Sequence, residues 1–115
     1  FWQWQTYRRE IYNMVKIFRT IDNNVHQINE AQEGSWIALI NPTATEIVEI
    51  AEKYNIDVDH LRAPLDEEER SRIEVEDHYT LILVDIPMIE ERNDKEWYGT
   101  IPMGIVVTDD KIFTV

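Results

Sequence analysis

Carboxylates are the side chains whose grouping in this sequence most suggests chemistry, and they gather in two places. Residues 66–69 are all acidic, and the pair Glu90 and Glu91 is followed closely by Asp94 and Glu96. Oxygen ligands of this kind bind hard divalent cations such as Mg²⁺. Each group also has a plainer interpretation, because a run of charges is commonly a solvated helix start and a polar segment is commonly an exposed hairpin loop.

The other residue types that carry chemistry do not form a recognisable motif. His26, His60 and His78 are dispersed, and none forms the helical histidine pair with an intervening glutamate that a metalloprotease needs. The glycines do not form a phosphate-binding loop, and no serine lies in a nucleophile elbow. A metal-dependent hydrolase would require carboxylates and histidines at matched spacing. The sequence therefore predicts a protein that is not an enzyme.

The charge and hydrophobicity of the chain exclude several classes of binding partner. The chain has 23 acidic and 11 basic residues, a net charge of −12, and no cysteine. This charge repels phosphate backbones, so neither nucleic acid nor an anionic lipid surface is expected as a partner. The longest apolar run, Leu81 to Ile89, is broken by Asp85 and Pro87. It is far shorter than the roughly 20 apolar residues of a membrane-spanning helix, so we do not expect this fragment to insert in a membrane.

The first half of the chain reads as a hairpin, a central strand and two helices. Alternating residues within 15–28 predict the hairpin, and the apolar run Ser35 to Ile40 predicts a strand buried on both faces. Thr43 and Glu46 have the spacing of a capping box, which predicts a helix as far as Tyr54. A shorter helix is expected after Asp57.

The second half reads as strands. Residues 70–76 alternate, with Ile73 and Val75 as the expected apolar face, and strands are also predicted over 79–89, 100–107 and 112–115. We predict a loop over 90–96. The fold class expected is α/β (α+β), a mixed and largely antiparallel β-sheet with helices packed on it. Residues 1–13 are predicted to be an N-terminal extension or a cloning remnant, although their aromatic residues also fit a helix.

The order of several short segments resembles the CorA family of divalent-cation transporters. The residues that carry this resemblance are Trp36 with Asn41-Pro42-Thr43, Leu65-Asp66, residues 69–74 (Glu-Arg-Ser-Arg-Ile-Glu), Asp77-His78-Tyr79, Ile86-Pro87, residues 100–105 (Thr-Ile-Pro-Met-Gly-Ile) and Thr114-Val115. Together these segments cover residues 14–115, and they follow one another in the family's order.

The resemblance implies that residues 14–115 are the cytoplasmic N-terminal α/β domain of a Mg²⁺/Co²⁺ transporter of the cell membrane, truncated before a long helix and the membrane helices. Such a domain would assemble with its own subunits as a homo-pentamer and sense divalent cations between them. By position, Glu90 is the nearest match to the family's regulatory metal ligand and Glu91 the next, with weak, regulatory Mg²⁺ binding expected. The family's Gly-Met-Asn pore signature is absent from these residues, so the fragment itself is not expected to transport ions.

Two alternatives remain open. The chain could belong to a zinc-transporting branch of the same family, because ion choice resides mostly in other segments. It could instead be a free-standing, soluble protein-binding module.

Overall fold

The computed structural model describes residues 14–115, so the predictions for residues 1–13 fall outside it. It contains one seven-stranded sheet with the strand order β2-β1-β3-β7-β6-β5-β4. The strands are β1 (Met14–Ile21), β2 (Asn24–Ile28), β3 (Ser35–Ile40), β4 (Arg72–Val75), β5 (Tyr79–Arg92), β6 (Lys95–Thr108) and β7 (Lys111–Thr114). All neighbours are antiparallel except β3 and β7, which are parallel. The predicted fold class is confirmed.

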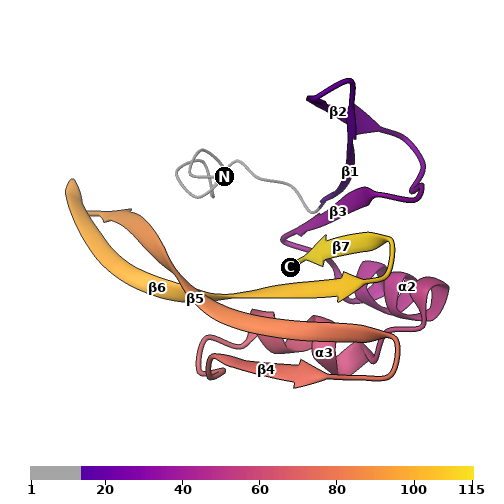
Figure 1. Ribbon diagram of the computed structural model, residues 1–115. Helices are drawn as coiled ribbons and strands as arrows, with labels where there is room; N and C mark the ends of the chain where they lie inside the picture. The colour runs from indigo at the N-terminus through magenta and orange to yellow at the C-terminus, as the bar shows by residue number, and fades with distance from the viewer. Residues whose placement is uncertain (1–13) are drawn as a thin grey trace.

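Helices cover one face of this sheet (Figure 1). They are α2 (Ala44–Tyr54), α3 (Val58–Arg62) and the short 3₁₀ helix η2 (Ala63–Leu65). The predicted capping box is present, because Thr43 Oγ1 accepts from the Glu46 N–H at 3.1 Å while the Thr43 N–H donates to Glu46 Oε1 at 2.8 Å. Asn55 ends α2 in the left-handed conformation, with φ of 54°. No helix among residues 14–115 is long and apolar enough to cross a membrane.

The predicted loop over 90–96 is wrong. β5 and β6 continue through this segment as one long hairpin that extends beyond the helices (Figure 1). Only Asn93 and Asp94 make the turn, with φ of 51° and 61°. Asn and Asp tolerate this left-handed backbone, which matches the twist of a tight hairpin. The other polar residues that suggested a loop belong to the two strands at this end of the hairpin.

The core lies between the helices and the sheet. Phe113, Val106 and Leu81 are fully buried and directly opposite one another on neighbouring strands. Ile47 of α2 and Leu61 of α3 pack against this face from the helix side. The core therefore fixes where α3 sits over the sheet, which positions the side chains described below.

The apolar face of the edge strand β4 points away from the helices. Arg72 and Glu74 lie opposite Leu83 and Leu81 and so face the helices. Ile73 and Val75 face the other way, where 67% and 77% of their surface is exposed. On that helix-free face, a cross-strand row joins exposed Val75, Val107, Ile112 and Trp36 through Thr80.

Candidate functional site

A histidine and two glutamates converge at the junction of α3 and β4. His60 Nε2 lies 2.7 Å from Glu74 Oε2 and 3.9 Å from Glu76 Oε1. The strand pleat places Glu74 and Glu76 on the same side. Among the described residues, these three form the group whose ligand atoms, all within 4.8 Å of one another, could hold a metal ion.

Tyr79 holds the opposite side of the His60 ring. Tyr79 Oη lies 2.6 Å from His60 Nδ1 and accepts a hydrogen bond from the Asp57 N–H at 3.1 Å. The Tyr79 hydroxyl can therefore donate to Nδ1, which leaves the imidazole proton on Nε2 to be donated to Glu74. This chain of hydrogen bonds orients the ring without requiring a charged histidine. Burial and the nearby carboxylates raise the pKa of Tyr79 above its ordinary value, so the phenol stays protonated at neutral pH.

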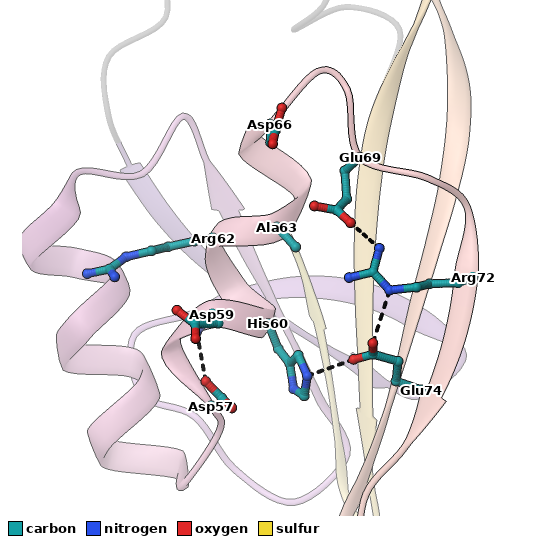
Figure 2. Close-up of a pocket in the computed structure, with 9 residues that line it drawn as sticks. All are labelled: Asp57, Asp59, His60, Arg62, Ala63, Asp66, Glu69, Arg72 and Glu74. Atoms are coloured by element: carbon teal, nitrogen blue, oxygen red, sulfur yellow. Dashed lines mark hydrogen bonds and ion pairs between the residues drawn. The ribbon is translucent and has the colours of Figure 1, made fainter.

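Glu74 is oriented by a second partner. Arg72 Nε donates to Glu74 Oε1 at 3.1 Å, and the guanidinium also pairs with Glu69. Hydrogen bonds to Glu69 and then Glu74 raise the pKa of Arg72 further above its already high value. Oε2 of Glu74 is thereby left pointing at the histidine, as Figure 2 shows.

An open pocket of about 480 Å³ lies beside this cluster. It is lined by Asp57, Asp59, His60, Arg62, Ala63, Asp66, Glu69, Arg72 and Glu74 (Figure 2). The polar lining makes the pocket suitable for a small hydrated or charged ligand rather than for an apolar one.

The acidic run 66–69 does not converge on a single point. Asp66 Oδ1 accepts from the Glu68 N–H at 3.0 Å in a local turn, while Glu69 pairs with Arg72. Glu67 and Glu68 are exposed. This arrangement agrees with the plainer interpretation of a solvated acidic segment.

Glu90 and Glu91 lie near the tip of the β5–β6 hairpin. Glu90 is opposite Trp97, and Glu91 is opposite Glu96. Because successive strand residues point to opposite faces, these two glutamates cannot converge on one ion within a single chain. Tyr98 donates to Glu96 Oε2 at 2.8 Å, and this bond raises the pKa of the Tyr98 hydroxyl.

The other histidines occupy separate places. His78 Nε2 lies 3.1 Å from the Asn55 backbone oxygen, which ties the β4–β5 turn to the end of α2. His26 is exposed on β2. Reasoning from the sequence missed the grouping of His60 with Glu74 and Glu76. The signal available was the alternation of 72, 74 and 76, which puts three charged side chains on one face of a strand.

Comparison with known proteins identifies the family. The family described as "CorA-like Mg2+ transporter protein" matches residues 31–115. The cobalt/magnesium transport protein CorA of Methanocaldococcus jannaschii is 29% identical over 80 residues, which span 70% of this chain and 24% of the relative. The chain thus spans about a quarter of that relative's length.

Solved structures show the same fold. The complete CorA magnesium transporter of M. jannaschii superimposes with a TM-score of 0.67 over 90% of this chain and 32% of its own, at 22% identity. The soluble domain of the same protein gives 0.71 over 90% of this chain and 41% of its own, also at 22% identity. The family match covers most of the sequence, and the chain belongs to the CorA-like Mg²⁺ transporter family.

Proposed function

We propose that this chain is the N-terminal regulatory and assembly domain of a CorA-like Mg²⁺/Co²⁺ transporter, lying on the cytoplasmic side of the cell membrane. The observation that carries the proposal is the family match over residues 31–115. The relatives' names supply the transported ions, magnesium and cobalt. In this role the domain senses divalent cations where subunits meet, and its partners are further copies of the same subunit in a homo-pentamer.

The proposed mechanism is the relief of charge repulsion. The chain carries a net charge of −12, and the residues proposed to lie where subunits meet, Glu90 and Glu91, are both acidic. Acidic subunits brought together repel. Mg²⁺ bound between subunits offsets this repulsion, so loss of the ion favours separation of the domains.

Glu90 and Glu91 are the proposed regulatory ligands. Carboxylates suit Mg²⁺, which keeps much of its water shell and therefore binds weakly to a site with one or two protein ligands. The strand pleat adds a constraint, because only one of the two residues can face a given neighbouring subunit. A second ligand must come from that neighbour.

The test uses the complete transporter that contains this domain. Glu90→Gln and Glu91→Gln remove one charge each without changing side-chain size, and Glu52→Gln in the exposed surface of α2 is the control. We expect one of the two hairpin variants to raise the Mg²⁺ concentration that half-inhibits uptake, while the control does not. Unchanged inhibition in both hairpin variants, with normal expression, would remove these residues from the regulatory role.

A soluble protein-binding module remains the alternative, favoured by the exposed apolar row that includes Val75 and Trp36. Such a surface commonly marks a contact with another protein. Cell fractionation separates the two proposals. A transporter subunit carrying this domain is recovered with the membranes, whereas a binding module remains in the soluble fraction. A zinc-transporting branch would be distinguished by uptake of Zn²⁺ in preference to Mg²⁺ and Co²⁺.

A further inference from the structure

We propose that His60, Glu74 and Glu76 form a binding site for a first-row transition-metal dication, with Zn²⁺ as the representative ion. This site differs from the hairpin glutamates in its residues and in its ligand chemistry, and it lies within a single chain. The imidazole nitrogen is the decisive ligand, because it suits Zn²⁺, Co²⁺ and Ni²⁺, whereas Mg²⁺ favours oxygen ligands in near-octahedral geometry.

The geometry is close to what such an ion requires. A tetrahedral Zn²⁺ with bonds of about 2.0–2.1 Å separates its ligand atoms by about 3.3 Å. The two separations from His60 Nε2 are 2.7 Å to Glu74 and 3.9 Å to Glu76, which lie on either side of that value. Small rotations of the two glutamate side chains therefore make room for the ion, and water completes its coordination.

The surrounding hydrogen bonds are those of a metal-binding histidine. Metal ligation by Nε2 places the imidazole proton on Nδ1, where it is donated to an oxygen. Tyr79 Oη, at 2.6 Å from Nδ1, is that oxygen. On metal binding, Nε2 releases its proton to solvent and Nδ1 takes one up from solvent, so the histidine stays neutral. The hydroxyl hydrogen of Tyr79 then turns away from Nδ1, and the bond from Nε2 to Glu74 is replaced by a bond to the metal. Arg72 continues to orient Glu74 through the other carboxylate oxygen.

The ligands come from elements whose relative position is fixed. Leu61, next to His60, is fully buried in the core. Glu76 follows β4 directly, and its N–H donates to the Tyr79 carbonyl at 2.9 Å. The His60 side chain is 13% exposed, whereas those of Glu74 and Glu76 are 37% and 45% exposed. The nitrogen is thus held from the protein side, and the carboxylates leave a route for an ion from solvent.

The charge of the three ligands favours binding of a dication at this site. Neutral His60 with two carboxylates gives a ligand set of charge −2, which a divalent ion neutralises. The competing interpretation is a purely structural network that ties α3 to β4 and needs no metal. The two interpretations differ in what Zn²⁺ does, so binding of the metal itself separates them.

The experiment is isothermal titration of the 115-residue chain with ZnCl₂ and, separately, with MgCl₂. We expect one Zn²⁺ per chain, bound at least tenfold more tightly than Mg²⁺. Glu76→Gln and His60→Ala should each weaken Zn²⁺ binding at least tenfold. His26→Ala and Glu49→Gln, which alter exposed residues outside the cluster, should change it less than twofold.

A second measurement distinguishes the loss of a metal ligand from the loss of folding. Co²⁺ bound in the site gives visible absorption that should be lost in His60→Ala, and circular dichroism reports whether that variant is folded. Glu76 lies outside the core, so Glu76→Gln tests the ligand set even if His60→Ala fails to fold. Absence of saturable Zn²⁺ binding, or binding that Glu76→Gln and Glu74→Gln leave within twofold of the unmodified chain, would overturn the proposal. Because no transport is measured, this outcome is independent of the regulatory role of the hairpin.

Discussion

Replacing Gly104 by alanine tests the packing that holds α3 and η2 against the sheet. Gly104 lies in β6, is buried, and exchanges two backbone hydrogen bonds with Val115, at 2.9 and 3.2 Å. A Cβ at this position would overlap Pro64 Cγ and lie 3.3 Å from Pro64 Cβ. Its φ is not in the left-handed region, which among the described glycines only Gly34 adopts. The cost of the substitution therefore comes from packing and not from backbone strain.

The size of this cost follows from two opposing effects. Overfilling a well-packed site typically costs about 1–3 kcal/mol. Loss of glycine's freedom in the unfolded chain returns about 0.4–1 kcal/mol where the backbone accepts alanine. We therefore expect Gly104→Ala to lower the free energy of unfolding by about 1–2 kcal/mol. For a chain of 115 residues, that loss corresponds to a fall in Tm of about 4–8 °C.

Thermal and urea unfolding followed by circular dichroism measure the effect, and Gly99→Ala is the matched control. Gly99 lies in the same strand, but the nearest atom to its added Cβ is Met88 Cε at 4.0 Å. Its substitution should leave stability unchanged or slightly raised. Pro64→Ala removes the ring that the new Cβ would overlap. The double variant Pro64→Ala with Gly104→Ala should therefore lose less free energy of unfolding than the two single variants lose together, by at least about 0.5 kcal/mol. Equal stability of Gly104→Ala and Gly99→Ala would refute the close approach of η2 to β6.

Two further predictions concern a helix cap and a turn. Thr43→Ala removes a side-chain cap of α2 and should lower the free energy of unfolding by about 1 kcal/mol in urea titrations, whereas Thr45→Ala in the first turn of α2 should not. Lys111 donates to Asp110 Oδ2 at 2.9 Å and lowers the pKa of Asp110. The ion pair stabilises the fold above a pH of about 3.9, the ordinary pKa of an aspartate, and this stabilisation is lost as the pH falls and Asp110 becomes protonated. Asp110→Asn should therefore lower the urea midpoint at pH 7 but not near pH 2, and a similar loss with Asp109→Asn would contradict the assignment.

The features that were predicted correctly depend on local sequence. The capping box at Thr43 and Glu46, the cap at Asp57 and the hairpin within 15–28 each involve residues a few positions apart. Their hydrogen bonds form within one turn or one hairpin, so spacing alone is sufficient to find them.

The features that were missed depend on contacts between distant segments. The β5–β6 hairpin continues through Glu90 to Glu96 because Asn93 and Asp94 fit a tight turn, although the polarity of the segment suggested a loop. The cluster of His60 with Glu74 joins α3 to a strand that begins ten residues after α3 ends, across η2 and the acidic run. Dispersed histidines reveal such a grouping only when the strand register is known.

The orientation of β4 explains why the cluster of His60, Glu74 and Glu76 forms. A shift of one residue in the pairing of β4 with β5 would turn Ile73 and Val75 toward the helices and expel Glu74, as the apolar pattern alone suggests. In the observed register, Ile73 and Val75 stay exposed to solvent. In exchange, Glu74 bonds to His60 and Arg72, and the Tyr79 carbonyl accepts from the Glu76 N–H. On the other face, Val75 joins a row with Val107 that continues across the sheet, so its apolar surface is grouped and not isolated. The register thus places polar groups where the partly buried His60 finds its partners and apolar groups where the sheet is already apolar.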